Sequence, residues 1–167
     1  IRDGYKRQGL RCSELAAALG GDALIQEIAR LNTATGRFES CDPVAGADFP
    51  ILAGRGYLIR TRADASLVWP WSPSCPVTTL NAGPNLVGHP APTDGLTCFG
   101  WLAAQAVDTV TAIQRLNPIT GRIQTCAVHD TAGEGLHLIG EDFPVRAGQS
   151  YLIHAARSVD LVLPGCP

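Results

Sequence analysis

The amino-acid sequence predicts a mainly β, β-rich α+β fold. It is built from two tandem homologous modules, each a small sandwich- or barrel-like unit with one short helix. Three observations predict this class. The segment RLNTATGRFESC, residues 30–41, returns as RLNPITGRIQTC, residues 115–126, with seven of twelve positions identical. Asp-Phe-Pro, Ala-Gly and Tyr-Leu-Ile recur in order at residues 48–59 and 142–153. Between the turn signals lie short apolar runs of strand length.

Each copy of the first repeat is typical of a β-hairpin. An apolar run reaches an Asn-x-x-Thr-Gly turn, Asn32 to Gly36 in the first copy and Asn117 to Gly121 in the second. Asparagine can hydrogen-bond its own backbone in a turn, and glycine adopts a positive φ at little cost. These four residues are therefore predicted to form the turns, with positive φ at both glycines.

The cysteine spacing predicts two equivalent disulfides. The distance along the chain from Cys12 to Cys41 is nearly that from Cys98 to Cys126. A repeated module with one internal crosslink would leave this pattern. The absence of a Cys-x-x-Cys pair disfavours zinc sites and thioredoxin-like redox motifs.

The remaining cysteines, Cys75 and Cys166, stand at equivalent module ends. They are expected either to join each other or to join other chains. Disulfides persist in oxidising compartments, so we expect the protein to be extracellular or at a cell surface. The competing interpretation is six buried free thiols.

The repeat also predicts the domain boundaries. We expect module 1 at residues 1–70, a linker at 71–76 rich in Pro, Trp and Ser, and module 2 at 77–167. Short helices are expected at Glu14–Leu19, with Ser13 as N-cap, and at Phe99–Val107. Residues 127–140, longer than their counterpart in module 1, are expected to form a polar surface loop.

One strand of the repeat occurs only once. Module 2 begins with an apolar strand at Val77–Val87, but alignment on Cys12 and Cys98 places Ile1 opposite Val87. Module 1 would therefore have an open slot, and unpaired sheet edges invite other strands. Upstream residues, another subunit or a rearranged edge could fill it. We expect Ile1, Tyr5 and Leu10 to contact a neighbouring copy head-to-tail at this edge.

The succession Gly83-x-Asn85-Leu86-Val87, helix, hairpin and Gly148-x-x-Tyr151-Leu152-Ile153 resembles modules repeated in secreted and surface bacterial proteins. Those modules carry a Gly-Trp-Asn-Leu-Ile strand and a later Gly-x-Gly-Tyr strand. Here Pro84 replaces the usual Trp, and only Gly54-x-Gly56-Tyr57 keeps both later glycines. The resemblance implies an accessory or structural part of an extracellular protein, with no catalytic residues to transfer.

Composition and motifs disfavour several functions. A net charge of −2 without a basic cluster argues against nucleic acid. No apolar run has the length of a membrane span. We find no hydrolase, metalloprotease or nucleotide-binding motif, and we expect no enzyme activity, no cofactor and no metal. His129 and His137 are expected to be solvated in the polar loop.

Two charged pairs also repeat. Asp48 and Asp142 each precede Phe-Pro, and we expect them to cap turns. Arg37 and Arg122 follow the turn glycines and could pair with these aspartates. The alternative is that both arginines lie on a solvated strand face.

The function expected from these features is a non-enzymatic extracellular structural repeat protein that associates with copies of itself, as in a surface filament. The alternative is an accessory carbohydrate-binding or adhesive domain. Trp69, Trp71 and Trp101 could stack on sugars. For Trp69 and Trp71 we favour packing between the modules, and for Trp101 the core.

Peptide mapping without reduction tests the crosslinks. We expect Cys12–Cys41 and Cys98–Cys126 fragments, each bridge contributing about 3–4 kcal/mol in the chain-entropy account. A Cys12–Cys98 fragment would contradict the pairing.

Overall fold

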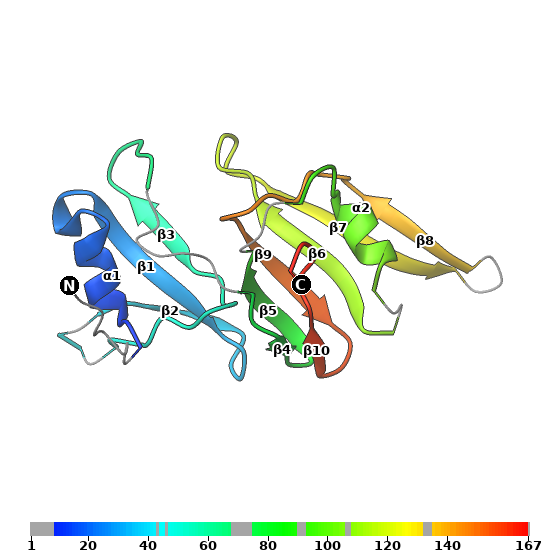
Figure 1. Cartoon of the computed structure of the whole chain (residues 1–167), viewed down its shortest axis with the longest axis horizontal. Helices are drawn as coiled ribbons and strands as arrows, with labels where there is room; N and C mark the ends of the chain where they lie inside the picture. The colour runs from blue at the N-terminus through cyan, green and yellow to red at the C-terminus, as the bar shows by residue number, and fades with distance from the viewer. Residues whose placement is uncertain are drawn as a thin grey trace, which may run out of the picture.

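The computed structural model describes residues 9–42, 44–45, 47–67, 75–89, 93–105, 108–131 and 135–166. It confirms the predicted class, because the described chain is mainly β with two short helices and several sheets. Figure 1 shows the module 1 strands beside the larger module 2 sheet. The predicted linker residues 71–74 lie outside the described ranges.

Module 1 is a three-stranded antiparallel sheet with one helix against it. The sheet order is β2-β1-β3. Its core contains Cys12, Leu15, Ile25, Ile28 and Phe49, all buried. The elements are α1 (Cys12–Ala18), the 3₁₀ turn η1 (Gly21–Ala23), β1 (Ile25–Asn32), β2 (Arg37–Ser40) and β3 (Leu58–Thr61).

Helix α1 begins earlier than predicted. Its N-cap is Arg11, whose backbone N–H donates to the Glu14 carboxylate at 2.8 Å, and not Ser13. Ser13 lies in the first turn, where its N–H and hydroxyl donate to Asp48. Serine is a common N-cap, so the sequence favoured Ser13. In the structure the acceptor for the first-turn donors is instead Asp48, which lies in a distant segment of the chain.

Module 2 is larger. A five-stranded antiparallel sheet has the order β5-β9-β6-β7-β8, and β4 pairs with β10 in a separate two-stranded ladder. The elements are β4 (Thr78–Leu80), β5 (Gly83–Gly88), α2 (Cys98–Ala103), β6 (Val110–Leu116), β7 (Ile123–Thr131), β8 (Gly135–Gly140), β9 (Ser150–Ala155) and β10 (Val159–Leu161).

Two sequence expectations for module 2 were wrong. Residues 127–140 are no simple loop, because β7 continues to Thr131 and pairs with β8. His129 and His137 are opposed on these strands, both exposed. The predicted single strand Val77–Val87 is divided into β4 and β5 by a corner.

The corner between β4 and β5 is held by one buried side chain. The Asn85 amide donates to the Asn81 carbonyl at 2.7 Å and the Gly83 carbonyl at 3.0 Å. Its Oδ1 accepts from the Asn81 N–H at 2.9 Å. Because Asn85 is fully buried, these bonds satisfy polar groups that could not reach water.

The structure contains both predicted bridges, Cys12–Cys41 and Cys98–Cys126. It also joins Cys75 to Cys166, the first of the two alternatives left open by the sequence. Cys75 was placed in the linker, yet its bridge ties it to the end of module 2.

The two hairpin turns have the predicted conformation. In each, the asparagine side chain accepts from two backbone N–H groups, those of Ala34 and Thr35 at Asn32 and those of Ile119 and Thr120 at Asn117. Gly36 and Gly121 both have φ of 67°.

We predict that Gly121→Ala lowers the free energy of unfolding by about 1–2 kcal/mol, the usual cost of a left-handed alanine. No atom lies within 4 Å of the added Cβ, so backbone strain is the sole new cost. Gly100→Ala in α2 is the control with the opposite sign, since alanine favours helix and meets ordinary contacts there. Urea unfolding of both variants measures the difference. Equal midpoints for Gly121→Ala and wild type would contradict the prediction.

Candidate functional site

The two modules meet where a turn of module 1, residues 52–57, contacts β5. Arg55 forms an antiparallel bridge with Val87. The Gly56 N–H donates to the Leu86 carbonyl at 2.9 Å, and the Gly88 N–H donates to the Gly54 carbonyl at 3.2 Å. We call this contact the junction. Figure 1 shows β5 on the side of module 2 that faces module 1.

Three glycines allow this close approach. A Cβ at Gly54 would overlap Thr78 Oγ1, one at Gly56 would lie 2.8 Å from Leu86 Cγ, and one at Gly88 would lie 2.9 Å from the Arg55 carbonyl oxygen. Real Cβ atoms do not occupy such positions without displacement of their neighbours. The junction is therefore a contact between backbones.

Ser150 completes the junction from β9. Its hydroxyl accepts from the Tyr57 N–H at 3.3 Å and donates to the Tyr57 carbonyl at 3.4 Å. A side chain thus contacts the backbone groups of Tyr57 that a strand would otherwise pair. A further bond joins Asn81 Nδ2 to Thr33 Oγ1 at 3.0 Å.

Beyond the junction, β3 has one unpaired side. β3 pairs with β1, and no strand in the described part of the chain pairs with its other side. Its counterpart β9 lies between β6 and β5. We call the free side of Leu58–Thr61 the open edge.

Backbone directions along β3 identify which groups the open edge presents. The Arg62 N–H donates to the Leu24 carbonyl at 2.9 Å, on the β1 side. The Tyr57 N–H points away from β1, to Ser150. Because N–H groups alternate in direction along a strand, those of Ile59 and Thr61 also point away from β1.

The side chains beside the open edge of module 1 are less buried than their counterparts in module 2. Tyr57, Ile59 and Leu67 are half-buried in module 1. Their counterparts in module 2 are 0% exposed at Tyr151, 0% at Ile153 and 4% at Leu161.

The module 2 counterparts are covered by β4 and β5, for which the described part of module 1 shows no equivalent. Val87 pairs with Tyr151, Asn85 with Ile153 and Thr78 with Leu161. Some matched positions are equally buried, as Ile28 and Ile113 show. Cys41 and Ile51 of module 1 are also only half-buried where Cys126 and Val145 are buried, so the module 1 core is less covered at several positions, the row beside β3 among them.

Of the residues expected to contact a neighbour, Ile1 and Tyr5 lie outside the described ranges. Leu10 is half-buried against the module 1 core, and its carbonyl accepts from the Ile51 N–H at 2.6 Å. Leu10 is therefore part of the module 1 fold.

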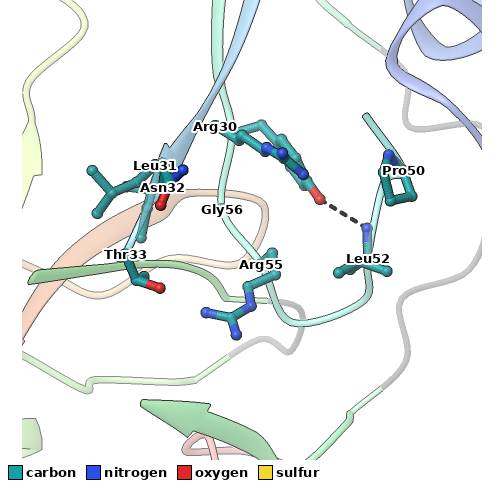
Figure 2. A pocket seen from close by; sticks show the side chains of 10 residues that line it. Arg30, Leu31, Asn32, Thr33, Pro50, Leu52, Arg55 and Gly56 are labelled. Atoms are coloured by element: carbon teal, nitrogen blue, oxygen red, sulfur yellow. Dashed lines mark hydrogen bonds between the residues drawn. The ribbon is translucent and has the colours of Figure 1, made fainter. Parts of the chain in front are cut away.

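A pocket of about 250 Å³ adjoins the junction. Figure 2 shows its lining, with a dashed line for the bond from the Leu52 N–H to the Tyr57 hydroxyl at 2.8 Å. Burial raises the pKa of Tyr57, so this phenol stays neutral. The lining residues are Arg30, Leu31, Asn32, Thr33, Pro50, Leu52, Arg55, Gly56, Tyr57 and Leu86.

Arg30 in this pocket has structural partners. Its guanidinium lies 2.9 Å from the Glu39 carboxylate and 4.6 Å from the centre of the Phe49 ring. In module 2, Arg115 lies 4.6 Å from the centre of Phe143 in the same way. Because the arrangement repeats, it indicates a role in the framework of each module.

The repeated aspartates differ from the expected turn caps. Asp48 accepts from the Ser13 N–H at 3.1 Å and from Arg11 Nε at 2.9 Å, and Asp142 accepts from the Phe99 N–H at 2.9 Å. Each therefore binds the first turn of a helix across the module. Arg11 makes the ion pair with Asp48, while Arg37 and Arg122 are exposed, as the alternative of a solvated strand face would have them.

The carboxyl groups with shifted pKa values are held ionised. At Asp48, burial acts to raise the pKa, but hydrogen bonds from Ser13 and Arg11 outweigh it and lower the pKa. Hydrogen bonds from Asn32 and Arg30 lower the pKa of Glu39. A general acid needs a raised pKa, so both groups fit a structural role better.

Two further candidate features give no site. Cys12, Cys41 and Asp48 lie close together, but both sulfur atoms are in a disulfide and offer no thiolate to a metal. Trp101 is fully buried and packs edge-on against Tyr151 at 5.6 Å between ring centres, so it cannot stack on a sugar. Trp69 and Trp71 lie outside the described ranges.

Comparison of the chain with family models, curated proteins and solved structures found no match. Among the described residues, no helix is long and apolar enough to cross a membrane. Sequence reasoning missed the junction. The only signal was the pair Gly54 and Gly56, where module 2 has Gly148 and Ser150.

We predict that Gly88→Ala lowers the free energy of unfolding by about 1–3 kcal/mol, the usual cost of overpacking. The added methyl group would press on the Arg55 carbonyl and open the junction. Faster hydrogen exchange of the Gly56 amide should accompany the loss. Gly9→Ala, where the Cβ meets nothing within 4 Å, is the control. An unchanged Gly56 exchange rate would show that this contact is not required.

We predict that Asp48 contributes stability that disappears in acid. Its pKa in the folded state lies below the reference value of 3.8. The contribution is therefore present above about pH 4 and is lost as the pH falls through the lowered pKa. Asp48→Asn should lower the free energy of unfolding at pH 7. The further decrease in the free energy of unfolding between pH 7 and pH 3 should be smaller in this variant than in wild type. Urea unfolding at both pH values measures the two effects. Asp64→Asn, at an exposed site, is the control, and equal pH dependence of the two variants would refute this role.

Proposed function

We propose that the chain is a non-enzymatic structural repeat protein of the extracellular space or cell surface. In this proposal it associates with copies of itself through the open edge of module 1 and forms the subunit of a filament. The supporting observation is the half-buried row Tyr57, Ile59 and Leu67 beside the open edge, where the equivalent row of module 2 is buried.

The three disulfides support a location outside a reducing compartment. Modules of this size bury a limited apolar surface, so crosslinks contribute a large share of their stability. A protein exposed to proteases and dilution outside the cell benefits from such stabilisation.

The side-chain chemistry supports a non-enzymatic role. Asp48 and Glu39 are held as anions by arginine and backbone or amide donors. Arg30 of the pocket lies over the ring of Phe49, and Arg115 lies over Phe143 in the same way in module 2.

The open edge of β3 supports self-association. A free edge presents N–H and C=O groups that pair readily with another strand. When one end of a chain binds a different surface of the next copy, the contact is heterologous and builds a filament unless the rotation closes a ring.

Sedimentation velocity across a wide concentration range, with negative-stain micrographs, tests the proposal. We expect the full chain to form extended particles as its concentration rises. Thr61→Pro, which removes an outward N–H from the open edge, should strongly reduce assembly and leave both modules folded.

A full chain that stays monomeric, or a Thr61→Pro chain that assembles equally well, would refute this form of self-association. Binding of the monomer to a glycan array would then favour the accessory carbohydrate-binding alternative.

A further inference from the structure

We infer that the open edge is a binding site for one kind of partner, an extended segment of the β4–β5 type supplied by a homologous module. Such a segment resembles Thr78–Gly88 of this chain, with Leu-Asn-x-Gly-x-Asn-Leu-Val as its pattern. The inference rests on the proposed function in one respect, since it names what pairs with the edge.

Module 2 shows how such a segment is seated. β5 pairs with β9 so that Val87 is opposite Tyr151, Asn85 opposite Ile153 and Gly83 opposite Ala155. The preceding strand, β4, pairs with β10 and contributes the buried Leu80. The segment therefore closes one side of the module 2 core.

The repeat transfers this register to module 1. Tyr57, Ile59 and Thr61 correspond to Tyr151, Ile153 and Ala155. A bound segment would place its valine opposite Tyr57, its second asparagine opposite Ile59 and its glycine opposite Thr61. The outward backbone groups of Ile59 and Thr61 would then be paired.

The chain's own β5 does not occupy this register. At the junction Val87 is opposite Arg55. The register of β5 with β9 would instead place it opposite Tyr57, two residues later, because Val87 pairs with Tyr151 in module 2. The junction thus covers the backbone up to Tyr57, and among the described residues no strand pairs with the outer side of Leu58–Thr61. An incoming segment would exchange the Ser150 hydroxyl at Tyr57 for backbone bonds.

The side chains of the edge select the partner. On the core side it presents Tyr57, Ile59 and Thr61, which carry no charge. The one charged residue of β3, Arg60, points to the other face, where its guanidinium lies 3.5 Å from Glu27. A strand with alternating apolar residues matches this edge, since main-chain bonds supply affinity and side-chain pockets supply specificity.

A synthetic peptide of residues 77–89, labelled and titrated with the full chain, tests the inference. We expect saturable 1:1 binding. A peptide with Asn85→Ala should bind about tenfold more weakly or worse, because the corner of the bound segment is then no longer held. Equal binding of both peptides, or no binding by the native peptide, would overturn the inference.

Amide hydrogen exchange of the full chain locates the site. With peptide present, the amides of Ile59 and Thr61 should become protected, while those of Leu58 and Arg60, which face β1, should change little. Protection elsewhere without Ile59 and Thr61 would place the peptide on another surface and overturn the inference.

Two proline variants give a matched control in the same sheet. Thr61→Pro removes an outward N–H from the open edge and should weaken peptide binding. Ser40→Pro removes an outward N–H from β2, because the next N–H along the strand, that of Cys41, donates to β1. This variant should leave peptide binding unchanged. Melting curves check that both variants are folded, and equal affinities would contradict the site.

The outcomes separate the two proposals. If the peptide binds at Ile59 and Thr61 but the chain stays monomeric, the binding site stands and self-association is wrong. If the chain assembles while these amides remain unprotected with and without peptide, assembly uses another surface and the inference is wrong.

Discussion

The pairing of β5 with its two neighbours is the interaction on which the rest of the structure depends. On one side β5 forms a continuous ladder with β9 and closes the module 2 core. On the other side it accepts the turn of module 1 through two backbone bonds. Both contacts require a fixed start to the strand, and Asn85 supplies it by holding the corner after β4. One buried amide thus fixes both a core and a junction.

The framework shared by the modules explains why a single strand makes such a difference. Each module has its own disulfide, its own arginine over phenylalanine and its own aspartate bound to the start of the helix. These contacts lie away from the β5 position, so they hold equally well with or without that strand. Module 1 can therefore keep the shape of its sheet while Tyr57 and Ile59 remain only half-buried.

The sequence predicted what is local and repeated, and it missed what is made across space. The Asn-Gly turns and the cysteine pairs depend on residues close together or matched in spacing, so comparison of the copies located them. β8 has no counterpart in the described part of module 1, and polar residues such as His137 interrupt its apolar pattern, so residues 127–140 looked like a loop. The partners of Asp48 lie 35–37 residues away, and no spacing rule predicts them.

The difference between Gly56 and Ser150 determines where a further strand could be added. Docking of β5 requires glycine at the first position, because a Cβ there would lie 2.8 Å from Leu86. Module 2 has serine at the equivalent position, so its own turn cannot receive a β5 strand in the same geometry. The glycine that the junction uses is therefore present in module 1 and replaced by serine in module 2. In the described part of the chain, the open edge of β3 combines outward backbone groups with the partly buried side chains of Tyr57 and Ile59, so a strand added there would cover apolar surface as well as pair backbone groups.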